Sequence, residues 1–590
     1  MNIIKTLKDY FGHSSFRPLQ KEVIDAILNQ EDVLMILPTG GGKSLCYQLP
    51  SLLMHGVTVV ISPLLALMHD QVVSLQANGI SSEMLSSMQS IQECNEIEER
   101  LRNSEIKILY IAPERLTNST FIELLHQLEI NFFVVDEAHC MSEWGHEFRQ
   151  SYRQLNILKE NFSYIPICAF TATATSIVET DIIQNLKLNN PKSLRGSLFR
   201  KNLIINIQHK IDDGKSQLLE FLSLYKNEAG IIYTLSRKDT ESLSKFLNTK
   251  GINAKPYHAG LSTIEKNQTY SDFVADKIEI VVATIAFGMG IDKSNIRFVV
   301  HITLPKTIEN FYQEIGRAGR DGLEAKTLLL FSAQDIIKQK NFIDALPQNE
   351  YQKNAFNKLD SIVRFVNGEK CRHQNIANYF DEELESCKLY CDNCTDSEVE
   401  KVDITQASKM LLSAIYRTNQ RFGLHYIVDI LRGSKDQRIL QNSHNELSVY
   451  AIGKDYSKSQ WMSIGDKLLE IEAVTIGEFK VYSLTNFAIE ILKGKHKIDI
   501  KKSRLNVQKI VIKSVNTNDY DSIIYEKLRS LRTKIASREN IPPYIVFSDK
   551  TLKEMSIKLP KNKSDMLAIH GIGEIKYQRY GEEFLKELSE

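Results

Sequence analysis

A glycine-rich stretch near the amino terminus has the residue types needed to bind phosphate. LPTGGGKS (37–44) follows an apolar run and precedes a helical pattern, and the glycine amides of such a turn can cradle phosphate groups. Lys43 would reach the β- and γ-phosphates, and Ser44 would offer its hydroxyl to Mg²⁺. Leu37 stands where the strict motif has its first glycine, so a tight strand-to-helix turn is the structural alternative. The residues expected to contact the nucleotide here are Thr39, Gly40, Gly41, Gly42, Lys43 and Ser44.

Two carboxylates come directly after a second apolar run. In FFVVDEAH (132–139), Asp136 would hold Mg²⁺, and Glu137 would orient and deprotonate the attacking water. An exposed acidic turn after a strand is the alternative. The phosphate loop and this acidic pair together predict ATP hydrolysis.

A pair of arginines could supply positive charge from elsewhere in the chain. YQEIGRAGRDG (312–322) sets Arg317 and Arg320 three residues apart, which places them on one side of a helical turn. There they could reach across a cleft to the γ-phosphate and stabilise transferred charge. Two solvated arginines on a surface helix are the alternative.

Buried strands must position these groups. Apolar runs alternate with helical patterns over roughly the first 340 residues, which predicts doubly wound parallel sheets with ligands at the carboxyl ends of the strands. The first series of expected strands is 32–37, 57–62, 106–112, 132–137 and 165–172. The second is 229–234, 253–259, 278–284, 297–302 and 325–331, and the two lobes are joined near 199–210.

Composition limits the class of protein. The net charge of zero argues against a histone-like positive surface over the whole protein and leaves local basic surfaces open. With no apolar run of about 18 residues and no secretory signal at the start, we expect a cytosolic chain that is nucleoid-associated if bacterial. The stretch 493–513 has eight basic residues against one Asp, and is either a solvated linker or a phosphate-contacting segment.

Four of the eight cysteines are clustered. Their C-x15-C-x3-C-x2-C spacing predicts a closed, structural Zn²⁺ site, with reduced and unliganded thiols as the alternative. The expected ligands are Cys371, Cys387, Cys391 and Cys394.

Read in order, the motifs resemble those of RecQ-family DNA helicases of superfamily two. They are FRPLQ (16–20), LPTGGGKS, SPLLALMHDQ (62–71), APERL (112–116), DEAHCMSEWGHEFR (136–149), FTATAT (170–175), VVATIAFGMGIDK (281–293) and QEIGRAGRDG (313–322). The resemblance implies an α/β fold of two RecA-like parallel-sheet lobes, then a helical zinc module, a winged helix and a small all-α HRDC-like domain. The expected boundaries are 1–205, 206–345, 346–400, 401–495 and 515–590.

The resemblance also assigns roles at the nucleotide site. Gln20 would read the adenine edge with support from Arg17, and His13 stands where the family often has an aromatic that stacks on the base. Asp292 would contact the ribose.

A further set would contact DNA. Trp144 is one of only two tryptophans and belongs to an aromatic loop after DEAH. This loop resembles the family's sensor of single-stranded DNA. Aromatic rings suit that role because they stack on any base. His146 would relay DNA occupancy to Glu137. A buried aromatic cluster is the alternative. The residues expected at DNA are Pro113, Trp144, His146, Phe148, Arg149, His258 and Thr284.

The activity implied is that of an ATP- and Mg²⁺-dependent 3′–5′ DNA helicase that acts on tailed or branched duplexes in recombination, repair, replication and the SOS response. Single-stranded and duplex DNA are the expected partners, with single-strand-binding protein and a topoisomerase by family resemblance, for a monomer without a membrane partner. The alternatives are an RNA-remodelling ATPase and a scaffold in which ATP is only a switch. HGIGEIKYQRYG (570–581) is either a phosphate-binding hairpin or plain helix packing.

Overall fold

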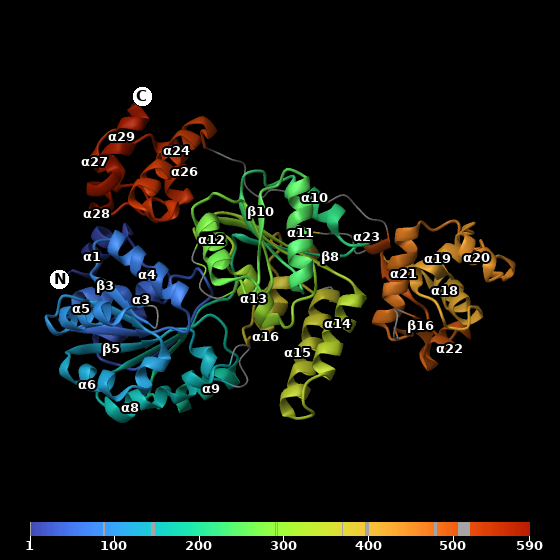
Figure 1. Cartoon of the computed structure of the whole chain (residues 1–590), viewed down its shortest axis with the longest axis horizontal. Coiled ribbons are helices and arrows are strands. Elements are labelled where there is room, and N and C mark those ends of the chain that lie inside the picture. Colours follow the sequence, from blue (N-terminus) through green and yellow to red (C-terminus); the bar gives the residue numbers. More distant parts are fainter. Residues whose placement is uncertain are drawn as a thin grey trace.

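The computed structural model describes residues 2–86, 89–142, 148–288, 291, 293–368, 370–395, 401–476, 481–505 and 520–589. Two α/β lobes lie side by side (Figure 1). The zinc module extends from the second lobe, the winged helix lies at the far end, and the carboxyl-terminal helical domain lies above the first lobe. No helix among the described residues is long and apolar enough to cross a membrane.

The first lobe contains a seven-stranded parallel sheet. Its strand order is β3-β4-β2-β5-β6-β1-β7. The central strands are buried on both faces, which explains their continuous apolar runs. The strands are β1 (Val33–Ile36), β2 (Val57–Ile61), β3 (Ser82–Leu85), β4 (Ile108–Ile111), β5 (Ile130–Val135), β6 (Ile167–Thr171) and β7 (Lys192–Arg195).

Helices cover both faces of this sheet. Side chains of α2, α3 and α4 form the core on one face, and those of α5, α6, α8 and α9 form it on the other. The helices are α1 (Ile3–Phe11), α2 (Gln20–Leu28), α3 (Lys43–Leu53), α4 (Leu65–Ala77), α5 (Ile91–Arg102), α6 (Ser119–Gln127), α7 (Gln150–Arg153), α8 (Ile157–Asn161) and α9 (Ser176–Asn185), with 3₁₀ turns η1 (Pro113–Thr117), η2 (Ala138–Met141) and η3 (Gln154–Asn156).

The second lobe contains a six-stranded parallel sheet of order β10-β11-β9-β12-β13-β8. Its strands are β8 (Leu203–His209), β9 (Ala229–Tyr233), β10 (Ala254–Tyr257), β11 (Ile280–Ala283), β12 (Ile296–His301) and β13 (Ala325–Phe331). Its helices are α10 (Lys215–Leu222), α11 (Arg237–Thr249), α12 (Thr263–Val274), α13 (Ile308–Ile315) and α14 (Ala333–Asp344). Helices α10 and α11 cover one face, and α12 and α13 cover the other.

The zinc module shares a core with the second lobe, since its helices and cysteines pack in the same cluster as α12 and α13. It comprises α15 (Glu350–Asn367), α16 (Arg372–Tyr379) and α17 (Asp392–Thr395). The winged helix has a core of its own. It comprises β14 (Lys401–Asp403), α18 (Thr405–Arg417), α19 (Leu424–Leu431), α20 (Gln437–Gln441), η4 (His444–Glu446), α21 (Lys458–Glu470), β15 (Val474–Ile476), β16 (Tyr482–Leu484), α22 (Asn486–Leu492), β17 (Asp499–Lys501) and α23 (Lys502–Leu505).

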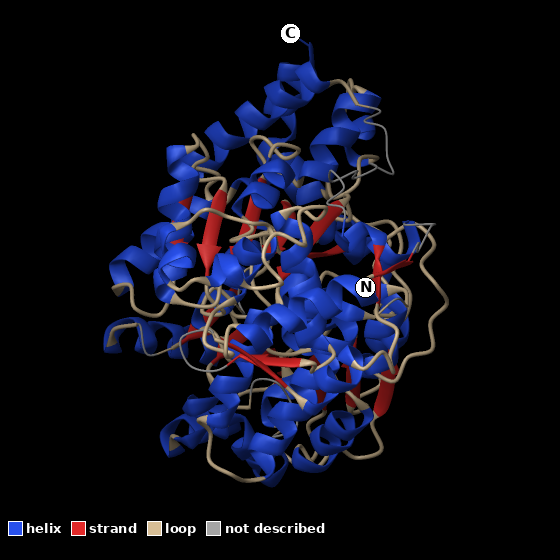
Figure 2. Ribbon diagram, turned by 90° about the vertical axis from the view of Figure 1, so that its right-hand side faces the viewer, coloured by secondary structure: helices blue, strands red, loops and turns tan. Residues whose placement is uncertain are grey.

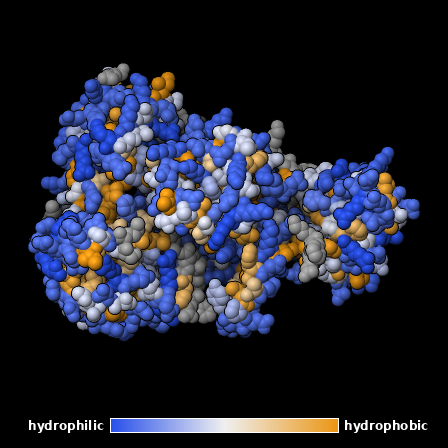
Figure 3. Space-filling model, viewed as in Figure 1, coloured by the Kyte–Doolittle hydropathy of each residue, from blue (hydrophilic) through white to orange (hydrophobic). Residues whose placement is uncertain are grey.

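The carboxyl-terminal domain is helical and also has its own core. It comprises α24 (Ser522–Glu539), α25 (Pro543–Val546), α26 (Asp549–Lys558), α27 (Lys563–Leu567), α28 (Glu574–Lys576), the π-helical turn η6 (Tyr577–Gly581) and α29 (Glu582–Ser589). Its surface is mainly hydrophilic where it faces the viewer in Figure 3, with hydrophobic side chains gathered at its boundary with the first lobe.

The expected α/β fold class is confirmed, with strands (red) enclosed by helices (blue) in Figure 2. Three strands of the two large sheets, β3, β7 and β8, were not predicted. β3 and β7 lie at sheet edges and are partly exposed, so neither has a continuous apolar run. β8 lies in the stretch 199–210 that we interpreted as a connection between lobes, and it pairs with β13 along its whole length.

Candidate functional site

The phosphate loop turns sharply between β1 and α3. Gly40 and Gly42 have positive φ angles of 78° and 86°, which favour glycine. Leu37, the departure from the strict motif, is buried, and its side chain fills the space where a Cβ on Gly196 would lie. Lys43 begins α3, and its ammonium donates to the Leu37 carbonyl over 2.9 Å. The loop is therefore preformed, with its lysine folded back onto the backbone.

Arg17 and Gln20 hold the loop from the side. Arg17 donates to the Gly40 carbonyl (2.6 Å), and the Gln20 amide donates to the Gly42 carbonyl (3.1 Å). Gln20 also accepts from the Arg17 backbone N–H at 2.8 Å. These two side chains, which the family resemblance assigns to adenine, thus contact the phosphate loop itself.

The acidic pair lies at the carboxyl end of β5. Burial lowers the pKa of Lys43, while the nearby carboxylates of Glu137 and Asp136 oppose that shift. Glu137 adopts a left-handed backbone conformation (φ 50°), and its Oε2 lies 3.4 Å from Nδ1 of His139. The lysine and both carboxylates therefore share one site.

His139 connects this site to the next motif. It is fully buried, and its Nδ1 is 2.9 Å from the hydroxyl of Thr171 at the end of β6. Burial, with the charges of Lys43 and Arg149, lowers the pKa of His139 to about 3, so the imidazole is neutral at pH 7. We did not single out either residue from the sequence, although the quoted motifs contain both.

The second lobe brings one arginine to the phosphate loop. A Cβ placed on Gly40 would lie 3.5 Å from Cα of Arg320, and one on Gly316 would lie 3.2 Å from Cβ of Thr39. Arg317, by contrast, is 2% exposed and interacts with Tyr233. The expected helical turn is absent, because α13 ends at Ile315 and both arginines lie in the turn that follows it.

His13 lies against the carboxyl-terminal domain. Its ring centroid is 4.9 Å from that of His570, at an interplanar angle of 33°. The Gly571 N–H donates to the Gly12 carbonyl (3.1 Å), and a Cβ on Gly12 would come within 2.5 Å of Gly571. The glycines of HGIG thus meet the first lobe beside the expected base site.

Contacts from the same domain reach both lobes. Arg579 donates to the Ala77 carbonyl of the first lobe over 3.1 Å. Arg529 donates to the Asn227 carbonyl of the second lobe over 3.3 Å, and the Lys293 ammonium lies 5.9 Å from the centroid of the Tyr544 ring. The carboxyl-terminal domain therefore contacts both lobes.

Three of the residues expected at DNA lie just after the carboxyl ends of strands. Pro113 begins η1 after β4, and His258 and Thr284 follow β10 and β11. Trp144, His146 and the ribose candidate Asp292 lie outside the described residues.

The described end of the aromatic loop is anchored to the first lobe. Phe148 is 39% exposed. Arg149 donates to the Pro63 carbonyl over 2.8 Å, and its backbone N–H donates to the Cys140 carbonyl, also at 2.8 Å.

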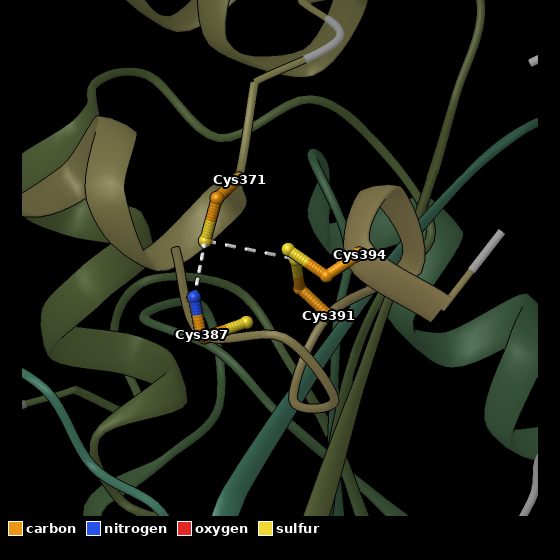
Figure 4. A group of neighbouring side chains, drawn as sticks. All are labelled: Cys371, Cys387, Cys391 and Cys394. Carbon is orange, nitrogen blue, oxygen red and sulfur yellow. Dashed lines mark hydrogen bonds between the residues drawn. The ribbon is translucent and has the colours of Figure 1, made fainter. Parts of the chain in front are cut away.

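The cysteine cluster converges as the spacing predicts (Figure 4). The four Sγ atoms lie within 4.8 Å of one another. The Cys387 N–H donates to Sγ of Cys371 (3.3 Å), and the Arg372 N–H donates to Sγ of Cys391 (3.4 Å). Backbone donors of this kind stabilise thiolates. This is the zinc site that the sequence predicted.

Two facing α/β lobes, a phosphate loop with an acidic pair in one, and an arginine from the other define a nucleotide-driven helicase motor. Family models match consecutive parts of the chain. They are the DEAD/DEAH box helicase (residues 17–180), the helicase conserved C-terminal domain (214–322), the RecQ zinc-binding (333–395), the RQC domain (398–509) and the HRDC domain (523–588).

Curated relatives match over nearly the whole chain. It is 41% identical to the ATP-dependent DNA helicase RecQ of Haemophilus influenzae, over 100% of this chain and 96% of that protein. The RecQ proteins of Pasteurella multocida (40%; 100% and 93%) and Bacillus subtilis (38%; 99% and 97%) are similar to it over comparable spans. The chain belongs to the RecQ family and is an ATP-dependent DNA helicase.

Proposed function

We propose that this helicase moves 3′ to 5′ along single-stranded DNA and unwinds tailed or branched duplexes in recombination and repair. The observation that most supports ATP-driven movement is the approach of Arg320, from the second lobe, to the phosphate loop of the first. The polarity is inferred from the family resemblance. The first lobe supplies the lysine and the carboxylates of the ATP site, and the second lobe supplies an arginine. A site shared in this way can couple ATP hydrolysis to movement of the lobes.

Each group at the cleft has a role in the proposed turnover. Lys43 turns from the Leu37 carbonyl to the β- and γ-phosphates, Glu137 orients and deprotonates the attacking water, and Arg320 stabilises charge on the transferred phosphoryl group. The Ser44 hydroxyl and the Asp136 carboxylate are hard oxygen donors that suit Mg²⁺. Bound there, Mg²⁺ would neutralise charge on the phosphates.

DNA occupancy is proposed to reach this site through the aromatic loop. Phe148, with Trp144, would stack on bases, and the bond from Arg149 to the Pro63 carbonyl ties the end of the loop to the first lobe. The contact between His139 and Thr171 continues the path from the acidic pair to β6. Because the Arg149 N–H bonds to the Cys140 carbonyl, and the neighbouring His139 lies 3.4 Å from Glu137, loop movement can alter the position of Glu137.

The test measures steady-state ATP hydrolysis without nucleic acid, with single-stranded DNA and with single-stranded RNA, alongside strand displacement from 3′-tailed and 5′-tailed duplexes. We expect stimulation by DNA, displacement only from the 3′ tail, and a much smaller ratio of stimulated to unstimulated rate in Trp144→Ala. Glu137→Gln should bind ATP and hydrolyse it at least 100-fold more slowly.

Other outcomes favour the alternatives. Equal stimulation by RNA would indicate a remodelling ATPase, because such enzymes share this motor. DNA binding without multiple turnovers would indicate a scaffold. Displacement from the 5′ tail alone would reverse the proposed polarity, and an unchanged DNA response in Trp144→Ala would make that side chain a packing residue.

A further inference from the structure

The segment between the two sheets contains an arginine bonded to the turn that holds Arg320. Arg200 follows β7 and precedes β8. Its guanidinium donates to the carbonyls of Gly316 (2.9 Å), Ala318 (2.8 Å) and Gly319 (2.8 Å). One side chain therefore satisfies three acceptors of a single turn.

These carbonyls are suited to a cation. They follow the end of α13, where carbonyl groups have no partner within the helix and carry partial negative charge. The N–H groups of the same residues bond elsewhere, to the carbonyls of Tyr312, Ile315 and Ile296. The guanidinium fork matches several closely spaced acceptors better than a lysine ammonium does.

A second linker side chain strengthens the attachment. The Asn202 amide donates to the carbonyls of Gly319 and Leu323, both over 2.8 Å. Gly319 has a φ of 62°, so the backbone turns sharply just before Arg320. The conformation of the turn is thus fixed from the linker side and not by a continuing helix.

Arg200 also lies close to the phosphate loop. A Cβ on Gly40 would be 3.7 Å from its Cζ and 3.5 Å from Cα of Arg320. Burial, together with the charges of Arg320 and Arg17, lowers the pKa of Arg200 to about 10, so the side chain is still charged at pH 7. The Arg200 guanidinium therefore lies close to Arg320 and already donates hydrogen bonds to three carbonyls.

The linker itself is fixed by the zinc module. The Glu382 carboxylate accepts from the Ser197 hydroxyl (2.6 Å) and the Leu198 N–H (2.8 Å). The Tyr312 hydroxyl of α13 donates to the Leu198 carbonyl over 2.9 Å. Arg200 therefore projects from a segment that is anchored on both sides.

We propose that Arg200 is a positioning residue for ATP hydrolysis, which holds the 316–320 turn so that Arg320 meets the γ-phosphate. The inference rests on the proposed role of Arg320. Because Arg200 belongs to the segment joining the lobes, it moves with the hinge and sets the direction in which Arg320 points when the cleft closes. The Arg200 guanidinium bonds to the backbone carbonyls of this turn, so its proposed effect on the nucleotide passes through Arg320.

The test compares Arg200→Gln, Arg200→Lys, Arg320→Ala and the double variant Arg200→Gln/Arg320→Ala in the full-length, zinc-loaded protein. DNA-stimulated kcat and KM for ATP, the Kd of a fluorescent ATP analogue and the melting temperature are measured for each. We expect Arg200→Gln to lower kcat roughly 10- to 100-fold with the analogue Kd within about twofold. Arg200→Lys should recover part of the loss, since it keeps the charge without the fork.

The double variant separates positioning from an independent effect. If Arg200 acts through Arg320, the double variant is no slower than Arg320→Ala alone. Multiplicative losses, or a kcat within twofold of wild type in Arg200→Gln, would overturn the inference. If Arg320→Ala hydrolyses ATP at the wild-type rate, the proposed role of Arg320 in hydrolysis is wrong, regardless of the kcat of the Arg200 variants. If Arg200→Gln does not fold, the same comparison of kcat is made between Arg200→Lys/Arg320→Ala and Arg320→Ala.

Discussion

The imidazole of His13, in the first lobe, lies 4.9 Å from the imidazole of His570, in the carboxyl-terminal domain. The two rings meet because Gly12 and Gly571 let the backbones approach until a hydrogen bond joins them. The residue that resembles a base-stacking position is therefore covered by a separate domain. We therefore expect docking of that domain to limit access to the proposed base site.

This contact predicts pH-dependent docking. Burial, then the charges of His570, Arg17, Lys550 and Lys576, lowers the pKa of His13 from 6.5 to about 4. The docked state thus binds fewer protons, so docking is fully stable above about pH 6.5 and weakens as the pH falls toward 4. At pH 5 the weakening is about 2 kcal/mol if the whole shift comes from docking.

Energy transfer between dyes on the first lobe and on the carboxyl-terminal domain, measured from pH 8 to pH 5, checks this expectation. His13→Phe keeps a ring but cannot titrate, so its docking should lose part of the pH dependence. Burial also lowers the pKa of His570, so the rest should disappear only when His570 is replaced as well. Unchanged transfer in the wild type at pH 5 would contradict the prediction.

The contact between His139 and Thr171 predicts a coupling defect. Thr171→Val keeps the side-chain volume and removes the hydroxyl that lies 2.9 Å from Nδ1 of His139. We expect the ratio of DNA-stimulated to unstimulated ATP hydrolysis to fall about tenfold, with a loss of about 1 kcal/mol of stability. Thr173→Val is the matched control, because the buried Thr173 hydroxyl has no hydrogen-bond partner among the described residues. Equal ratios in the two variants would rule out the coupling.

Zinc removal should impair ATP hydrolysis although the metal is remote from the nucleotide. In zinc-finger peptides, binding of structural zinc supplies about 10–16 kcal/mol of folding free energy. Loss of the metal, or Cys391→Ala, should free Glu382 from the linker and lower DNA-stimulated kcat at least tenfold. Metal content, melting and kcat are measured together. Cys94→Ser, outside the cluster, should retain zinc and activity; a zinc-free protein with normal kcat would refute the link.

A buried ion pair should stabilise the carboxyl-terminal domain. The fully buried Arg532 donates to the Asp549 carboxylate over 2.7 Å. Burial raises the pKa of Asp549, but Arg532 and Arg297 outweigh it and bring it to about 2. Asp549→Ala should therefore destabilise this domain by about 3–5 kcal/mol, seen as faster hydrogen exchange in α24. Acid should remove less, about 2 kcal/mol, and only as the pH falls below 3.8 toward 2, where Asp549 becomes protonated in the folded domain.

A matched surface variant separates this effect from general charge loss. Lys558 pairs with Glu554 on the exposed side of the same domain, and its removal should cost less than about 1 kcal/mol. Equal hydrogen-exchange rates in Asp549→Ala and Lys558→Ala would show that the buried pair stabilises the domain no more than the exposed pair does.

The zinc site could be predicted from sequence because its ligands lie close together in the chain, and their spacing alone limits how they converge. The central strands could be predicted for a similar reason, since burial on both faces requires continuous apolar runs. β7, with the sequence KSLR, is an exposed edge strand and carries no such signal.

The arrangement of the two arginines could not be predicted from their spacing. Three residues place two side chains on one side only if the helix continues, and here it ends at Ile315. Arg317 is consequently buried beside Tyr233, whereas Arg320 meets the phosphate loop. The pairing of His13 with His570 likewise depends on how whole domains dock, which local patterns do not encode.

The strand β8 forms one edge of the second sheet, and the zinc module lies against that edge. The Ile205 N–H donates to the Tyr390 carbonyl over 3.1 Å, and Ile205 bridges to the zinc ligand Cys391. An uncovered edge strand offers its backbone to other chains and promotes aggregation. The zinc module therefore also covers an edge strand that could pair with other chains, so zinc-free protein should aggregate faster than the zinc-loaded form.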